Sequence, residues 1–470
     1  MPLRGCSSRF PRWCFSTVIL VVSHGGAPAT AQSVVPRPLG AGLVVIQPTG
    51  DGSEGAKRTL DNPSGRLTLR EALSLALRQS PELASFAWEV RAREAAAIQA
   101  GRPPNPVADL LFEDLGSSGR SLADQRAGQP QATLQVSQLI ELGGKRAARR
   151  KLAETDRGLA EWDFETARID VLSRVTTAFL DVLVSQQAIA LAQRTSALIE
   201  QIDQTVRSRV EAGVVSPIEQ TKAGVALAMA RIEEQRARFA LAADRTTLAT
   251  LWGADTAAFA SAEGEVMPPA ATPSFETLAQ HVAQNPEVAR WAAEMARRDA
   301  ARALETARAI PDVTVSAGYR RFTSADSNAF VLGASIPLPL FDRNQAGIRA
   351  AAQRVAQARE AELATRLRIT TSLAVVYRDL AAASDEARAL ATEVLPGARS
   401  AFAAIEEGYR LGRFGYLDVL DAQRTLVAAE IQHLRAQGNA QKAVIALERL
   451  IGLPLADASI PPVTRQQEQP

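Results

Sequence analysis

The sequence carries one arrangement of elements twice, at a constant separation. Gly213 and Gly412 each end a long helical stretch, and Leu251-Trp252-Gly253 corresponds to Leu450-Ile451-Gly452. Both correspondences are 199 residues apart in the 470-residue chain. The length alone suggests about three globular domains, but a duplication at one separation predicts two copies of a single unit.

Each copy contains a helical stretch that is too long for a compact globule. Residues 145–212 include no proline and are rich in Ala, Leu, Arg, Gln and Glu, which propagate helices well. At about 1.5 Å per residue, such a helix approaches roughly 100 Å. A returning helix is predicted over 216–251, with Ser216 as its N-cap. In the second copy, long helices are predicted over 343–411 and 417–451, and Pro396 predicts a kink or break.

A shorter helix precedes each long one. Apolar residues at mixed three and four spacing predict an amphipathic helix over 69–100. In the second copy Ser274 caps a helix, and the run 284–288 repeats the pattern of 79–83. The pattern divides the chain into a signal peptide over 1–31, an extended arm over 32–66, a first repeat over 67–253, a linker over 254–273, a second repeat over 274–453 and a C-terminal tail over 454–470.

The signal peptide is predicted from a basic start, an apolar run over 15–22 and small residues at Ala29-Thr30-Ala31. Cys6 and Cys14 both lie within it, so the mature chain is expected to contain no disulfide and no thiolate site.

Two pairs of short segments alternate in the manner of strands, over 106–114 and 131–140 in the first copy and over 312–321 and 330–338 in the second. Strands of nine or ten residues are long enough to cross a membrane when tilted. Four strands are too few to close a barrel, and lipid does not tolerate open strand edges. The chain is therefore predicted to oligomerise. The polar residues expected to face the barrel interior are Thr133, Gln135, Ser137, Thr314 and Ser316.

Composition narrows the class of function. The 53 Lys+Arg and 51 Asp+Glu residues nearly balance, which argues against nucleic acid as a partner. A mean hydropathy of -0.06 argues against a protein with many transmembrane helices but leaves a membrane β-barrel open. Beyond the signal segment the only histidines are His281 and His433, on separate helices, so no metal site is predicted. No catalytic or cofactor signature is present, and an enzyme is not expected.

Gly143-Gly144-Lys145-Arg146 superficially matches a phosphate-binding loop. Lys145 is followed by Arg in place of Ser or Thr, and Leu139 stands where that loop needs glycine. We interpret Gly143, Gly144, Lys145 and Arg146 as a glycine hinge with basic residues at the junction of a barrel strand and the long helix.

The hairpin turns carry a family resemblance. Tyr409-Arg410-Leu411-Gly412, the following run 416–424 and the parallel Gly213-Val214-Val215-Ser216-Pro217 resemble the TolC-like outer membrane efflux protein family, as does the whole plan over about 67–453. The run 138–146 resembles the branch that forms the outer membrane components of cobalt-zinc-cadmium exporters.

The resemblance implies a mainly α protein with a small β part. It implies a homotrimer with a 12-stranded barrel among outer membrane lipids, continuous with a helical tunnel through the periplasm. A periplasmic membrane fusion (adaptor) protein and an inner-membrane resistance-nodulation-division type pump are the implied partners. The implied function is a passive exit duct for divalent heavy-metal cations such as Co, Zn and Cd. A duct for drugs or organic solutes is the alternative cargo, and a soluble periplasmic coiled-coil scaffold or adaptor is the alternative class.

The resemblance also implies roles for individual residues. Adaptor contact at the periplasmic entrance is expected at Gly213, Val214, Ser216, Pro217, Leu411, Gly412, Arg413 and Gly415, and the entrance gate at Tyr409, Asp418 and Asp421. Unusual backbone angles are expected at Gly213, Gly412 and Gly415. Phe414 stands where the family's best-understood channels hold a basic residue, so the chain departs from their ion-pair gate at this position.

Overall fold

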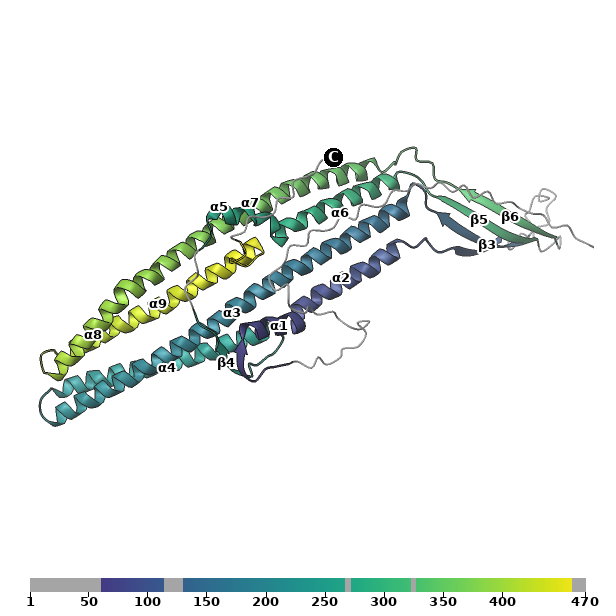
Figure 1. Cartoon of the computed structure of the whole chain (residues 1–470). Helices are drawn as coiled ribbons and strands as arrows, with labels where there is room; N and C mark the ends of the chain where they lie inside the picture. Colours follow the sequence, from purple (N-terminus) through teal and green to yellow (C-terminus); the bar gives the residue numbers. More distant parts are fainter. Residues whose placement is uncertain (1–60, 114–129, 267–271, 323–326, 459–470) are drawn as a thin grey trace, which may run out of the picture. The chain divides into compact units, whose positions relative to one another are not determined.

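The computed structural model describes residues 61–113, 130–266, 272–322 and 327–458 (Figure 1). The expected signal peptide, most of the expected arm and the end of the expected tail lie outside these residues. The first repeat contains β1 (Gly65–Thr68), α1 (Leu69–Gln79), α2 (Pro81–Ala100), β2 (Val107–Glu113), β3 (Gln131–Ile140), α3 (Lys145–Glu211) and α4 (Pro217–Thr250).

The second repeat has the same order of elements. It contains β4 (Phe259–Glu263), α5 (Phe275–Gln280), the 3-10 turn η1 (Val282–Gln284), α6 (Pro286–Arg308), β5 (Val313–Phe322), β6 (Ser327–Ser335), α7 (Gln345–Ala389), the π-helical segment η2 (Leu390–Val394), α8 (Leu395–Arg410) and α9 (Tyr416–Ile451). The predicted fold class, mainly α with a small β part and an internal repeat, is confirmed.

The single helix predicted over 69–100 is wrong, because the chain breaks between α1 and α2. Ser80 has φ -54° and ψ 121°, and Pro81 is the first residue of α2. Proline lacks the N–H that an uninterrupted helix needs and drives the preceding residue out of the helical region. α1 begins with a capping box, in which Thr68 and Glu71 satisfy each other's backbone groups.

The chain also contains a small parallel sheet that the sequence pattern did not reveal. β1 pairs with β4, which lies inside the segment expected to be a linker, and Leu67 stands opposite Ala262. Leu67 and Phe259 are fully buried with Trp252 in the core beside α3. The pairing joins residues nearly 200 positions apart, so no local sequence pattern predicts it.

α3 is the only helix in the described ranges that is long and apolar enough to cross a membrane by composition. Its apolar residues Val171, Val175 and Phe179 are buried in the protein's own core, against α1 and the β1–β4 sheet. Packing within the chain therefore explains the apolar character of this part of α3.

A four-stranded antiparallel sheet joins the two repeats in the order β2-β3-β5-β6. β3 and β5 pair along their full length, from Gln131 opposite Phe322 to Ile140 opposite Val313. The strand expected over 330–338 lies three residues earlier, at Ser327–Ser335. Pro337 and Pro339 follow this strand, and proline has no N–H to donate to a ladder.

The break expected at Pro396 is present. α7 passes into the π-helical segment η2, where the Leu395 N–H donates to the Leu390 carbonyl, and α8 resumes with Pro396 in its first turn. α3, the counterpart in the first repeat, is continuous over 67 residues.

Candidate functional site: the sheet, the strand–helix junction and the hairpin turns

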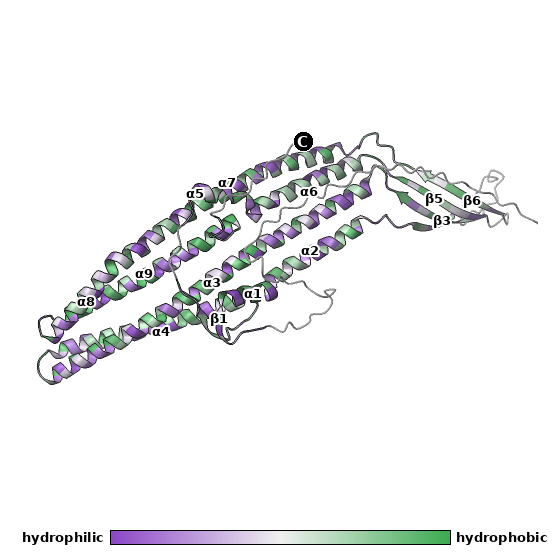
Figure 2. Cartoon of the chain, in the orientation of Figure 1, coloured by the Kyte–Doolittle hydropathy of each residue, from purple (hydrophilic) through white to green (hydrophobic). Residues whose placement is uncertain are grey.

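The four-stranded sheet has one apolar face and one polar face. Leu134, Val136 and Tyr319 point to the same side as Phe330 and Leu332, which are 86% and 83% exposed. Figure 2 shows the apolar residues in these strands. The opposite face contains Thr133, Gln135, Ser137, Thr314 and Ser316, which share one side as predicted. An exposed apolar face on a sheet this thin suits contact with lipid.

The polar face is held together by side-chain contacts. Arg320 Nε donates to Thr133 Oγ1 at 2.9 Å, and an Arg320 guanidinium nitrogen lies 3.4 Å from a Glu113 carboxylate oxygen. β2 and β6 each have a strand neighbour on one side within the described sheet. Their other edges carry backbone groups that pair with no described strand.

Gly143 and Gly144 form the junction between β3 and α3, with φ of 67° and 72°. A Cβ on Gly143 would lie 2.8 Å from the Ile310 Cβ, so a side chain has no room there. Lys145 Nζ lies 2.7 Å from Asp312 Oδ1, which also accepts a 3.0 Å hydrogen bond from the Leu142 N–H. The hinge is thus fastened to the loop that enters β5, while Arg146 is exposed.

A second ion pair at this junction ties the end of β3 to α3 and α2. Arg149 donates to both carboxylate oxygens of Glu141, at 2.5 and 3.0 Å, and to the Ala100 carbonyl at 2.9 Å. The hydrogen bond from Arg149 lowers the pKa of Glu141 below its usual value. Lys145, one of the two basic residues predicted at this junction, and Arg149 are therefore both paired with carboxylates.

The first hairpin turn joins α3 to α4. Gly213 has φ 70°, and the Val214 N–H donates to the Arg209 carbonyl at 2.8 Å, which closes the end of α3. Ser216 caps α4 by accepting a hydrogen bond from the Ile218 N–H at 3.3 Å, and Pro217 is its first residue. Val214 is exposed at the tip.

The second turn repeats this geometry between α8 and α9. Gly412 has φ 72°, and Leu411 and Arg413 are exposed. The unusual backbone angle expected at Gly415 is wrong, because its φ of -82° and ψ of 163° are extended values that any residue adopts. Gly415 instead donates its N–H to Asp418 Oδ2 at 2.8 Å, so Asp418 caps α9.

The expected gate residues do not form one cluster. Tyr409 is buried beside Tyr416, with ring centroids 6.4 Å apart, in the core between α3 and the second hairpin. Asp418 lies at the turn, and Asp421 lines a groove between α4 and α9 together with Lys222. Burial raises the pKa of Tyr416 to about 12.

Arg209 is the contact at the tip that sequence analysis missed. Its guanidinium lies 4.6 Å from the centroid of the Tyr409 ring, and Nη1 donates to the Tyr409 carbonyl at 3.2 Å. The cation that contacts Tyr409 therefore belongs to the first hairpin and does not occupy the position of Phe414. The Phe414 ring instead covers Gly408, where a Cβ would lie 2.3 Å from it. The sequence feature that could have indicated this contact is the position of Arg209, four residues before the turn glycine Gly213.

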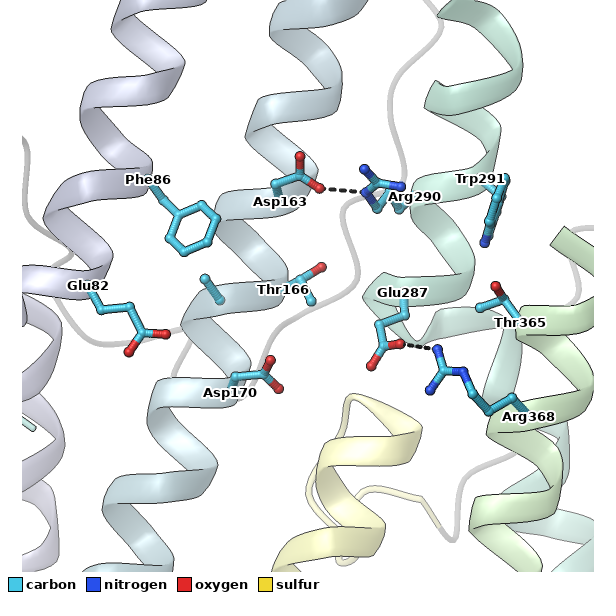
Figure 3. A pocket seen from close by; sticks show the side chains of 11 residues that line it. Glu82, Phe86, Asp163, Thr166, Asp170, Glu287, Arg290, Trp291, Thr365 and Arg368 are labelled. Carbon is cyan, nitrogen blue, oxygen red and sulfur yellow. Dashed lines mark hydrogen bonds and ion pairs between the residues drawn. The ribbon is translucent and has the colours of Figure 1, made fainter. Parts of the chain in front are cut away.

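A cavity of about 430 Å³ lies among α2, α3, α6 and α7 (Figure 3). Four carboxylates line it, and each has an arginine partner. Asp163 Oδ1 lies 2.5 Å from Arg290 Nε, and Glu287 Oε2 lies 2.5 Å from Arg368 Nη2. Within the described ranges, no group of three His, Cys, Asp or Glu side chains is arranged to hold a metal ion.

The fold and the amphipathic sheet define a class of protein: an outer membrane channel with long helical hairpins. The sequence profile of the outer membrane efflux protein family matches residues 72–254 and 277–453, and the chain belongs to this family. It is an outer membrane efflux channel, as predicted.

Relatives refine this assignment. The chain is 38% identical to the cobalt-zinc-cadmium resistance protein CzcC of Cupriavidus metallidurans, over 83% of this chain and 91% of that protein. It is 30% identical to the nickel-cobalt-cadmium resistance protein NccC of Alcaligenes xylosoxydans xylosoxydans, over 65% of this chain and 67% of that protein. The crystal structure of the outer membrane protein VceC from Vibrio cholerae shares the fold, with a TM-score of 0.67, 20% identity and coverage of 82% of this chain and 96% of that one.

Proposed function

We propose that the protein is the exit duct of a tripartite efflux system and that it works as a homotrimer. The observation that carries the trimer is the four-stranded sheet, whose apolar face suits lipid and whose edge strands β2 and β6 lack outer neighbours within the described residues. A barrel needs about eight strands or more, and an open edge is not stable in lipid. Three copies supply twelve strands, with β6 of one copy beside β2 of the next.

The two hairpin turns are the proposed contact with a periplasmic adaptor, which in turn joins an inner-membrane pump of the resistance-nodulation-division type. Gly213 and Gly412 hold both turns in the same conformation, and Val214 and Leu411 present exposed apolar side chains there. Apolar side chains held on a fixed backbone suit docking by a partner. Ser216, Pro217, Arg413 and Gly415 complete the two turns.

The proposed gate is the packing of the second hairpin against the first near the tip. Tyr409 and Arg209 join the two hairpins through a ring contact and a hydrogen bond. Asp418 contributes by capping α9, and Asp421 by its place in the groove beside α4. Tyr409 thus acts in the gate with a partner different from the one expected from the family.

The proposed cargo is divalent heavy-metal cations such as cobalt, zinc and cadmium. The support is the similarity to relatives named for resistance to these metals, over most of this chain for the first of them. The carboxylates of the interhelical cavity are each paired with arginine, and the described residues contain no group of three His, Cys, Asp or Glu side chains arranged to hold a cation.

Deleting the gene tests the cargo. We expect lower tolerance of zinc, cobalt and cadmium, restored by the gene on a plasmid, and unchanged tolerance of a panel of drugs. Sensitisation to drugs without sensitisation to any metal would assign the duct to organic solutes. Fractionating the cells tests the class: the duct stays in the outer membrane until detergent is added, whereas a soluble monomer in the periplasm would indicate a scaffold or adaptor.

A further inference from the structure

An apolar segment follows the four-stranded sheet where the chain leaves it for the helices. Residues 336–341 connect the end of β6 to the start of α7 (Figure 1). Apart from its two prolines, every side chain of the segment is apolar and exposed: Ile336 by 51%, Leu338 by 73%, Leu340 by 67% and Phe341 by 92%. The segment continues directly from β6, whose apolar residues belong to the face that suits lipid. The apolar surface therefore extends past the end of the strands.

The backbone of this segment exposes few unsatisfied N–H groups. Pro337 and Pro339 have no N–H to satisfy. The Leu340 N–H donates to the Leu338 carbonyl at 2.8 Å, within the segment itself. Backbone groups at the edge of the hydrocarbon region must find partners within the protein, so this arrangement suits contact with lipid.

Two side chains at the start of α7 provide donors for the carbonyls of the segment. Arg343 Nε donates to the Pro339 carbonyl at 3.0 Å. Gln345 Nε2 donates to the Phe341 carbonyl at 3.1 Å. The polar residues after the segment thus turn back onto its backbone, while its apolar side chains stay exposed.

The two long helices start in the same way, which allows their junctions with the sheet to be compared. α3 begins directly after Gly144, with φ 72°, and α7 begins directly after Asn344, with φ 55°. Both residues have a left-handed backbone, so the chain enters both helices from a similar direction. Residues counted from these two positions therefore occupy corresponding places at the two junctions.

The second junction lacks the ion pair that closes the first. By this count Phe341 stands where the first junction has Glu141, and Arg349 stands where it has Arg149. Glu141 and Arg149 lie 2.5 Å apart, and the carboxylate is mostly covered. Arg349 is exposed and has no ion pair among the residues that the structure describes. The second junction thus presents a large apolar side chain together with a cation that has no carboxylate partner.

We propose that this junction binds phospholipid of the periplasmic leaflet of the outer membrane. Leu338, Leu340 and Phe341 contact the acyl chains, and Arg349 binds the phosphate of the headgroup. An arginine side chain packs its stem on apolar surface while its guanidinium binds phosphate through paired hydrogen bonds. In a trimer, three such surfaces would fix the depth of the duct where its helices leave the membrane. The inference rests on the proposed function and adds where each copy is anchored below the barrel.

Spin labels on single cysteines test the acyl contact in the full-length channel. Leu338→Cys and Phe341→Cys each receive a nitroxide label, and each channel is reconstituted in vesicles of phosphatidylethanolamine and phosphatidylglycerol. Collisions with oxygen report lipid, and collisions with a water-soluble nickel chelate on both sides of the bilayer report water. Leu332→Cys on the sheet is the lipid control, and Val214→Cys at the first turn is the water control. The only cysteines of the unaltered chain lie in the expected signal peptide.

L338C and F341C are expected to match L332C, with frequent oxygen collisions and loss of the nickel collisions seen at V214C. Frequent nickel collisions at both sites would overturn the proposal, because the segment would then face water. Loss of both kinds of collision would also overturn it and would indicate that a neighbouring copy covers the segment. In either case an L332C label in lipid would leave the proposed function standing. Nickel collisions at L332C would overturn both this surface and the proposed duct.

The phospholipid that remains with detergent-purified channel tests the phosphate contact, measured as phosphorus per protein. Arg349→Gln is expected to lose bound phospholipid relative to the unaltered channel. Arg366→Gln, which alters another exposed arginine of α7, is the matched control and is expected to retain it. Equal phospholipid in the two variants would overturn the headgroup contact of Arg349.

Discussion

Replacing Gly143 with alanine should destabilise the strand–helix junction far more than the same change at Gly144. Both glycines have a left-handed backbone, which costs an alanine about 1–2 kcal/mol. Only at Gly143 does the new Cβ also collide, at 2.8 Å from both the Cβ and Cδ1 of Ile310 and 3.0 Å from the Ala307 carbonyl. Overpacking of this kind costs about 1–3 kcal/mol more. We expect a total of about 2–5 kcal/mol for G143A and about 1–2 kcal/mol for G144A.

Guanidinium unfolding of detergent-solubilised protein, followed by circular dichroism, measures this difference as a shift in midpoint at an unchanged slope. The variant Ile310→Ala removes one of the three colliding atoms, Cδ1, and keeps Cβ, so I310A should recover only part of the loss, about 1 kcal/mol, in the G143A background. Equal losses for G143A and G144A, or no recovery with I310A, would refute the steric account and leave backbone conformation as the only cause.

Other expectations concern the tip and the ion pairs. Gly412→Pro cannot hold φ near 72° and should abolish export while trimers persist by cross-linking; unchanged export would count against this turn. Tyr416→Phe removes a buried hydroxyl without a hydrogen-bond partner among the described residues, so the free energy of unfolding should stay unchanged or rise by up to about 1 kcal/mol. The tyrosine with a pKa of about 12 should also be lost from an absorbance titration. Arg209→Ala should raise uptake of a large antibiotic through a loosened entrance, and a Tyr409→Leu background should remove that effect. Glu141→Gln should lower the free energy of unfolding by about 1 kcal/mol. Because the folded pKa of Glu141 is lowered, its stabilisation is present above the unfolded pKa and lost as pH falls through the folded pKa. A Glu141→Gln variant whose stability falls with acid as the wild type's does would contradict this.

Sequence analysis anticipated elements that depend on local signals. The proline-free run predicted α3 almost to the residue, and alternation placed Thr133, Gln135 and Ser137 on one face of β3. Glycines at the two turns predicted left-handed conformations at Gly213 and Gly412, since the chain must reverse within a few residues.

The misses have physical reasons. β1 and β4 are short strands whose stability comes from each other and from Trp252, so pairing across nearly 200 residues left no local trace. The helix predicted over 69–100 includes Pro81, although the residue before a proline favours an extended backbone. The contact between Arg209 and Tyr409 joins residues 200 positions apart on different hairpins, so no local pattern predicts it, and the family resemblance implies a basic residue only on the second hairpin.

The release of zinc from preloaded cells tests the central claim most directly. Cells loaded with radiolabelled zinc would be transferred to zinc-free medium, and the retained label followed in wild-type cells, in a deletion strain, and in that strain with the gene restored. We expect the deletion strain to retain zinc and the restored gene to return release to the wild-type rate. Identical release with and without the gene, from cells whose pump and adaptor are intact, would contradict a role for this channel in metal export.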